Sequence, residues 1–469
     1  MSYIDEATNR LRRPDFERWM DQVSGTGYCA QPVRLVGSTS TFDSRTGDQL
    51  AHYTSSSEPD GVTYVRCGNR RAARCPSCSY EYKADMWHLV VAGAAGGSKG
   101  VPDSVAEHPL VFATLTAPSF GSVHSARTSS RGLARCRPRA HKLCPHGRPT
   151  WCMATHDHDS PAIGEPLCID CYDYESHISW QWHAPELWRR FVIRLRRELA
   201  ASLGVSETAA RKLVRVQFAK VAEFQRRGAV HFHALIRLDG DGNEANPFPA
   251  PRVPTTAAGL ANLIQVAAAA VDVIADPLPG ESASRRLKWG RQCDARPVHR
   301  QVDTEDGRLT DRAVAAYIAK YATKATEDLA STSSGSSRPH IATIRQLVAV
   351  AGRAAALDEN SSYRLLGRWE SMLGFRGHFS TKSRRYSTTL GRLRSARRDW
   401  QRKQKTPPIA PDPNLDDSEE TTLIISSWSF VGMGWLSAGD AALAAESAAA
   451  AREWRLNRRT ATQTNNEER

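Results

Sequence analysis

Residues 213–238, LVRVQFAKVAEFQRRGAVHFHALIRL, consist of two strand-like segments rich in apolar and β-branched residues. The triplet Arg-Arg-Gly at 226–228 separates the two segments. A short loop that ends in glycine is typical of a β-hairpin, because glycine readily adopts the positive φ such a loop requires. The sequence therefore predicts an antiparallel hairpin in which Gln225 pairs with Ala229.

The second segment carries His231 and His233 on either side of Phe232. Side chains alternate between the two faces of a strand, so both imidazoles lie on one face. The predicted register places Glu223 opposite His231 on that face, whereas a two-residue loop would place it on the other face. Two histidines and a carboxylate suit Mn²⁺, tolerate Mg²⁺ and leave positions open for phosphate oxygens. We predict a catalytic metal site; the alternative is two half-exposed surface histidines.

A second candidate group lies in a helix predicted to begin at Leu309, where Tyr317 and Tyr321 are each followed three residues later by a lysine, Lys320 and Lys324. The spacing of four places both tyrosines on one helix face, about 6 Å apart along the axis. A phenol with a pKa of about 10 needs a nearby cation to attack a phosphate. The pattern predicts two nucleophiles for successive transesterifications; the alternative is ordinary core packing.

The ten cysteines indicate metal binding rather than disulfide bonds if the chain resides in the cytosol. Two CxxC pairs predict one four-thiolate structural zinc site: Cys75, Cys78, Cys168 and Cys171. A second zinc site is predicted among the remaining clustered cysteines with nearby histidines: Cys67, Cys136, Cys144 and Cys152, with His141 and His146. We expect one or two Zn²⁺ ions, and buried free thiols are the alternative.

The net charge of +13 favours a polyanionic partner, above all nucleic acid. The sequence has no apolar run of about 18 residues and its polar opening lacks the apolar core of a signal peptide, so we expect a cytosolic protein without a membrane span. It also has no GxxxxGK[ST] phosphate loop, so no nucleotide cofactor is expected.

Residues 363–400 contain ten Arg or Lys and two acidic residues, interleaved with aromatic residues. Such a segment can neutralise phosphates and stack bases, although a solvated helix face has similar composition. The predicted DNA contacts are Arg376, Lys382, Arg384 and Arg385.

Three short motifs resemble those of HUH endonucleases, and within them the RepSA-like rolling-circle initiators of actinomycete plasmids and integrative elements. They are FATLTAPSFG at 112–121, VHFHALIRL at 230–238 and AAYIAKYATK at 315–324. The resemblance continues through CGNRRAARCPSC, PLCIDCYDY and LGFRGHFSTKSRRYS, from about residue 29 to 440. It implies an antiparallel sheet with helices on one side, His231 and His233 as metal ligands, and Tyr317 or Tyr321 as the nucleophile.

The expected fold class is therefore α+β, with an HUH-type antiparallel sheet, helices packed on it, a zinc-binding cysteine-rich module and C-terminal helices. The expected organisation follows the chain: an N-terminal β element with the first CxxC at 1–105, a nicking domain at 106–330 with a cysteine-rich insertion at 121–185, a basic helical DNA-contacting segment at 346–405, a linker at 406–422 and a C-terminal helix at 423–469.

The expected function is a plasmid replication initiator. It is a metal-dependent single-strand DNA endonuclease and transesterase that nicks the origin through a 5′-phosphotyrosine intermediate. Origin DNA, a host helicase and a polymerase are the expected partners. The alternatives are a conjugative relaxase or transposase of the HUH type, and a non-catalytic zinc-dependent DNA-binding regulator.

Overall fold

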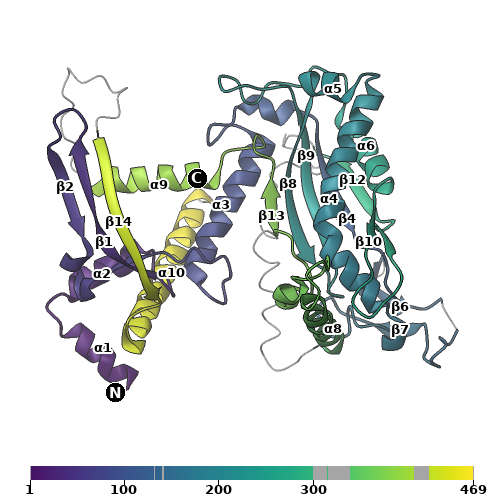
Figure 1. The fold of residues 1–469 in the computed structure, drawn as a ribbon, viewed down its shortest axis with the longest axis horizontal. Helices are drawn as coiled ribbons and strands as arrows, with labels where there is room; N and C mark the ends of the chain where they lie inside the picture. The colour runs from purple at the N-terminus through teal and green to yellow at the C-terminus, as the bar shows by residue number, and fades with distance from the viewer. Residues whose placement is uncertain are drawn as a thin grey trace. The chain divides into compact units, whose positions relative to one another are not determined.

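A computed structural model describes residues 2–130, 132–139, 142–298, 314, 338–405 and 422–467. The chain forms two compact units, one made of Met1–Ala84 with Ser395–Arg469 and the other of Asp85–Arg394. Helices α3 (Pro76–Ala95) and α9 (Leu390–Lys405) contribute residues to both. Each unit combines helices with antiparallel strands, so the predicted α+β class is confirmed (Figure 1).

The first unit is built on β1 (Val33–Asp43), which pairs antiparallel with β2 (Gln49–Thr54), β3 (Thr63–Val65) and β14 (Thr422–Met433). The strands predicted within residues 30–66 are therefore present. A small apolar core beside them contains the aromatic side chains Trp19, Tyr64 and Trp435. The helical and 3₁₀ elements of this unit are α1 (Tyr3–Leu11), α2 (Phe16–Gly25), η1 (Ser55–Ser57), η2 (Pro59–Gly61) and α10 (Ala438–Glu467).

The prediction of one C-terminal helix over 423–469 was wrong in its first part. The segment TLIISSWSFVGM forms β14, paired along its length with β1, and the helix begins only at Ala438. Isoleucine, tryptophan and phenylalanine favour a pleated surface, whereas the alanine-rich sequence that follows favours a helix. The β-prone segment had been included in the alanine-rich helix.

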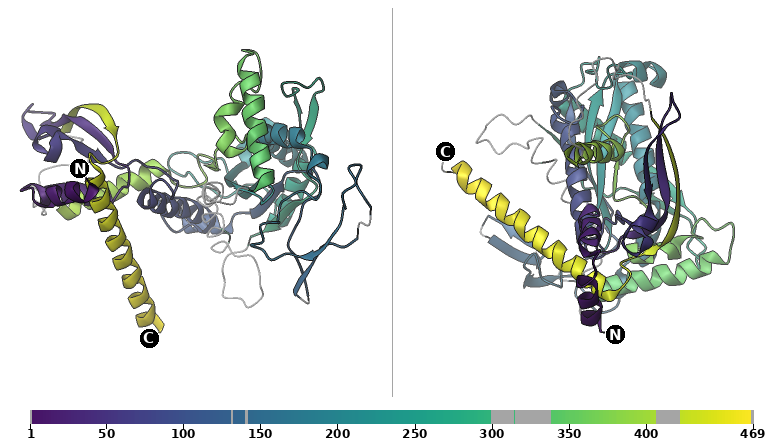
Figure 2. Two further views of the ribbon diagram at one scale, coloured as in Figure 1. Left: turned by 90° about the horizontal axis from the view of Figure 1, so that it is seen from below. Right: turned by 90° about the vertical axis from the view of Figure 1, so that its left-hand side faces the viewer.

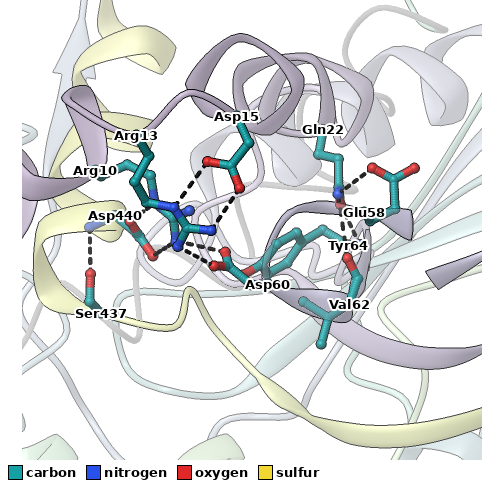
Figure 3. Close-up of polar contacts among 10 residues, drawn as sticks. All are labelled: Arg10, Arg13, Asp15, Gln22, Glu58, Asp60, Val62, Tyr64, Ser437 and Asp440. Carbon is teal, nitrogen blue, oxygen red and sulfur yellow. Dashed lines mark hydrogen bonds and ion pairs between the residues drawn. The ribbon is translucent and has the colours of Figure 1, made fainter. Parts of the chain in front are cut away.

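A buried ion-pair network ties the two ends of the chain together in this unit (Figure 3). The Arg10 guanidinium donates to Asp440 at 2.7 Å and to Asp60 at 2.6 Å, and Arg13 donates to Asp60 at 2.7 Å. Burial alone would lower the pKa of Arg10, but the hydrogen bonds to the two carboxylates raise it. Arg10 therefore stays charged and fixes α1 against η2 and the start of α10.

The second unit contains a five-stranded antiparallel sheet with the strand order β12-β4-β9-β8-β13. Its strands are β4 (Leu110–Thr116), β8 (Arg215–Phe224), β9 (Val230–Asp239), β12 (Cys293–Pro297) and β13 (Ser380–Lys382). Strand β13 comes from the segment predicted to be helical at 346–405. That segment instead runs through α8 (Pro339–Ala356), η6 (Leu366–Met372), β13 and α9.

Helix α4 (Tyr174–Ser202) runs along the central strands (Figure 1). The face of β9 that carries Val230, Phe232 and Ala234 belongs to the same apolar core as α4 and α6 (Ala257–Ala269). The ring of Trp188 meets Phe232 edge-on, with 5.9 Å between centroids. Because strand side chains alternate, this packing leaves the histidine positions of β9 on the opposite face.

The cysteine-rich insertion forms a three-stranded antiparallel sheet with the order β5-β6-β7. Its ribbon projects away from the central sheet of the same unit (Figure 2). The insertion ends before α4, which begins at Tyr174 rather than near residue 186, because the Asp173 side chain caps it by accepting from the backbone N–H of Ser176 at 2.8 Å.

The remaining elements of this unit are η3 (Asp103–Glu107), β5 (Arg127–Ser129), β6 (Gly132–Arg137), β7 (Cys152–Thr155), η4 (Ile169–Cys171), α5 (Glu207–Leu213), β10 (Asp272–Ala275) and β11 (Arg285–Lys288). None of the helices in the described ranges is long and apolar enough to span a lipid bilayer.

Candidate metal centre

The β8–β9 hairpin has the register that the sequence predicts. Glu223 pairs with His231, and the backbone N–H of Gln225 donates to the carbonyl of Ala229 at 2.9 Å. Gly228 closes the loop with a φ of 82°, a conformation that residues with a Cβ rarely adopt. The three-residue loop is confirmed, and with it the placement of the carboxylate on the histidine face.

Three side chains converge on this face. One carboxylate oxygen of Glu223, Oε2, lies 3.0 Å from Nε2 of His231 and 3.2 Å from Nε2 of His233. Adjacent ligands of an octahedral ion with bond lengths of about 2.1 Å are separated by roughly 3.0 Å. The spacing of these donor atoms therefore fits one divalent cation, held by two imidazoles and one carboxylate.

The neighbouring strand β4 orients His233. Thr114 is the residue of β4 that pairs with His233, and its Oγ1 lies 3.0 Å from Nδ1 of the imidazole. The ring of Phe112 stacks on the same imidazole with 5.7 Å between centroids. Contacts of this kind fix the ring and its tautomer, which leaves Nε2 free to act as a ligand.

The charge states also suit a cation. Burial acts to raise the pKa of Glu223, but hydrogen bonds to His231 and His233 outweigh it and lower the pKa to about 2. Burial lowers the pKa of His233, and the nearby carboxylate only partly offsets this. At neutral pH the site therefore presents an ionised carboxylate and a neutral His233. Both His231 and Glu223 keep 17% of their side chains exposed, so the centre is open on one side.

The tyrosines and lysines proposed from the sequence as the nucleophilic group lie outside the residues that the structure describes: Tyr317, Lys320, Tyr321 and Lys324. Their distance from the metal centre stays a prediction.

The cysteines form three further groups of candidate ligands rather than one or two. The groups are Cys29, Cys67, Cys75 and Cys78; His124, Cys136, Cys152 and His156; and Cys144, His146, Cys168 and Cys171. The prediction that both CxxC pairs share one ion was wrong, because each pair belongs to a group of its own. The cysteines assigned to a second ion, Cys67, Cys136, Cys144 and Cys152, are divided over all three groups.

Sequence reasoning missed four of these candidate ligands: Cys29, His124, His146 as a partner of the second CxxC, and His156. Cys29 could have been found by counting, because three cysteines near the first CxxC leave a tetrahedral site one ligand short and Cys29 is the remaining cysteine on that side of the chain. The histidines carry no comparable signal. His141 lies outside the described residues.

The four predicted DNA contacts have different surroundings. The Arg376 guanidinium stacks on Trp182, 4.3 Å from the ring centroid, and the Lys382 ammonium donates to backbone carbonyls, among them that of Ser387 at 3.1 Å. Both side chains are thus used within the protein. Arg384 and Arg385 instead line a cavity of about 550 Å³ together with further basic residues: Arg196, Arg211 and Arg215.

Comparison with known proteins gives one consistent result. Residues 15–449 match the RepSA family model, described as "Replication initiator protein, pSAM2". A replication initiator protein of Streptomyces ambofaciens is 42% identical over 460 residues, which cover 96% of this chain and 92% of that protein. No solved structure matches the chain at a significant level.

Proposed function

The chain belongs to the RepSA family of replication initiator proteins, and we propose that it starts rolling-circle replication as a metal-dependent, HUH-type DNA endonuclease and transesterase. The observation that carries this proposal is the convergence of Glu223, His231 and His233 on one point of the central sheet, with spacing that fits a single divalent ion. The site is open, which a catalytic centre requires and a closed structural site does not provide.

Mn²⁺ or Mg²⁺ bound there would neutralise and orient a scissile phosphate. In the proposed reaction, the phenol oxygen of Tyr317 or Tyr321 forms a bond to phosphorus and the bond to the 3′ oxygen breaks. The phenol proton goes to the medium or the leaving oxygen. The 5′ end stays linked to tyrosine, and a free 3′ hydroxyl primes synthesis. Lys320 and Lys324 would supply further positive charge for the phosphate.

Two tyrosines would permit two such exchanges, one to open the origin and one to release the displaced strand. Because neither exchange consumes a nucleotide, we assign unwinding and synthesis to a host helicase and polymerase. The chain would act on origin DNA in the cytoplasm.

The proposal is tested by incubating the full chain and Mn²⁺ with a supercoiled plasmid that bears a candidate origin. We expect relaxed product with protein attached to its 5′ end. Tyr317→Phe combined with Tyr321→Phe abolishes the adduct and keeps duplex binding, because only the phenol oxygens are removed. His231→Ala lowers nicking by at least about 100-fold through loss of a metal ligand.

Tyr3→Phe and His52→Ala serve as matched controls, because both residues lie on the surface of the first unit, and both variants should nick normally. An adduct that persists without both tyrosines would refute the assignment of the nucleophile. A protein that shifts origin DNA under all conditions without cutting it would be a non-catalytic regulator. Nicking confined to a transfer origin or transposon end would point to a relaxase or transposase.

A further inference from the structure

Nine of the ten cysteines gather with three histidines into three groups of four, and the tenth, Cys293, belongs to none of them. The first group is made of Cys29, Cys67, Cys75 and Cys78. Within it the Sγ atoms of Cys29 and Cys75, of Cys67 and Cys78, and of Cys78 and Cys29 are each 3.7 Å apart. Thiolates bound to zinc at about 2.3 Å in a tetrahedron lie roughly 3.8 Å apart. A disulfide would need about 2.0 Å.

The other two groups show the shorter separations that nitrogen ligands produce. Nδ1 of His124 lies 3.1 Å from Nε2 of His156, which is 3.4 Å from Sγ of Cys152. Nδ1 of His146 lies 3.2 Å from Sγ of Cys171 and 3.8 Å from that of Cys168. Bond lengths of about 2.0 Å for nitrogen and 2.3 Å for sulfur give separations of roughly 3.3 to 3.6 Å in a tetrahedron.

Backbone amides point at the sulfur atoms in all three groups. The N–H of Ala30 donates to Cys75 at 3.3 Å, that of Ser125 to Cys136 at 3.2 Å and that of Arg148 to Cys144 at 3.4 Å. Such donors stabilise a thiolate, the charged form that binds a metal, more than a neutral thiol.

The insertion has little else to hold it together. Among its described residues between Gly121 and Tyr172, the buried residues of apolar type are two of the candidate ligands, Cys136 and Cys168. All three residues of β5 are exposed. A segment of this size without an apolar core needs cross-links in order to fold. Structural zinc supplies such cross-links in a reducing compartment.

The insertion also contacts the tip of the hairpin that carries Glu223 and His231. Gly164 lies so close to the backbone of Arg226 that a Cβ at this position would be 2.4 Å from its carbonyl carbon. The carboxylate of Glu165 accepts from the backbone N–H of His340, whose Nε2 contacts the carbonyl of Arg227 at 3.0 Å. The tip is therefore held between the insertion and α8.

We propose that the protein holds three structural zinc ions, in a Cys₄, a Cys₂His₂ and a Cys₃His site, and that the latter two order the insertion that supports the metal-bearing hairpin. The link to the hairpin rests on the proposed function. The three zinc sites do not, because they depend only on their own ligand groups.

Metal analysis of the full chain, purified without chelators, tests the zinc sites. We expect three zinc ions per chain by elemental and native mass spectrometry, and one fewer in each of Cys67→Ser, Cys152→Ser and Cys144→Ser. Cys293→Ser is the matched control and keeps all three. Iron in place of zinc, or fewer than three ions with the thiols open to a chromogenic disulfide reagent, would overturn the proposal.

Variants that fail to fold do not block this test, because the wild-type chain can be titrated with a mercurial reagent. Modification of the nine grouped thiols should release three zinc ions, measured with a zinc indicator dye. Release of fewer ions would contradict the assignment.

A second measurement tests the link between the insertion and the hairpin. Electron paramagnetic resonance of free Mn²⁺ gives the affinity of the hairpin site, and we expect Cys168→Ser to weaken it at least fivefold while Cys293→Ser leaves it unchanged. Unchanged affinity after loss of the zinc ion would overturn the link. A wild-type chain that binds three zinc ions but no Mn²⁺ would instead refute the proposed function and leave the zinc sites standing.

Discussion

Glu223 and Lys220 lie three residues apart on β8 and face opposite sides of the sheet, in line with the alternation of a strand. Hydrogen bonds to two histidines keep the Glu223 carboxylate charged despite its burial. The Lys220 ammonium is 4% exposed and lies 4.1 Å from the centroid of the Phe232 ring. Burial lowers its pKa to about 7. One strand thus holds an anion for the metal centre and a costly cation in the core.

The Lys220 pKa predicts a pH dependence of stability. The folded-state pKa of about 7 lies below the ordinary value of 10.5, so the unfolded chain binds more protons between these values and stability rises with pH across this window. The expected contribution from pH 7 to pH 10 is about 3 kcal/mol. Lys220→Met removes this rise, which urea unfolding at a series of pH values measures.

Lys212→Met is the control, because Lys212 is exposed on α5 and its replacement should leave the pH profile as it is. Parallel profiles for wild type and Lys220→Met would show that the buried ammonium does not titrate in this range.

At the scale of the element, the β8–β9 hairpin was predictable because its determinants are local. Loop length, the glycine at its end and the period of two together fix which side chains share a face. The supports of the hairpin were not predictable, since they come from distant segments. Ile341 of α8, Leu373 and Gly164 all lie against the loop. A single sequence contains no local trace of such contacts.

Gly228→Ala tests how strictly the loop sets the metal centre. The φ of 82° disfavours alanine, and the added Cβ would lie 2.9 Å from Cδ1 of Ile341 and 3.1 Å from Cδ1 of Leu373. We expect a loss of stability of about 1 to 2 kcal/mol. We also expect Mn²⁺ affinity to fall at least about fivefold, or roughly 1 kcal/mol.

Gly280→Ala separates backbone strain from contact with neighbours. Its φ is 95° and nothing lies within 4 Å of the Cβ position, so the variant bears the strain alone. It should lose some stability and keep its Mn²⁺ affinity. Equal affinities in the two variants would mean that the loop does not position the ligands.

The zinc-ligand groups show where sequence reasoning failed. The cysteine spacing indicated metal binding, but it could not say which pairs share an ion, because the grouping depends on how long connections fold back. Cys144 and Cys168 come together across 24 positions, and Cys29 meets Cys75 across 46. The histidines of these groups sit in polar stretches that resemble ordinary surface loops, so their role emerged only from the fold.

At the scale of the whole molecule, the first unit joins segments from the two ends of the chain. Strand β14 pairs with β1 along 11 residues, and Arg10 bonds to both Asp60 and Asp440. The sequence predicted the N-terminal strands but assigned the C-terminal segment to a separate helix. Strand partners far apart in sequence leave no periodic pattern that identifies them.

Asp440→Ala tests this closure. Removing one partner leaves the buried Arg10 charge incompletely paired, which costs about 3 kcal/mol. Amide hydrogen exchange of β14, followed by mass spectrometry, should become faster by about 100-fold, because 1.4 kcal/mol corresponds to a factor of ten. Asp48→Ala, at an exposed turn, should leave the exchange rate unchanged. Unaltered exchange in Asp440→Ala would show that the network does not stabilise β14.

The pairing of β1 with β14 sets an order of events during protein synthesis. The second unit, Asp85–Arg394, is complete on the ribosome before residue 422 has been made, whereas the N-terminal strand must wait for its partner. A ribosome that stalls between these points releases a polypeptide with the whole hairpin and an unpaired strand edge. Such nascent chains would need protection from aggregation until the last 50 or so residues emerge.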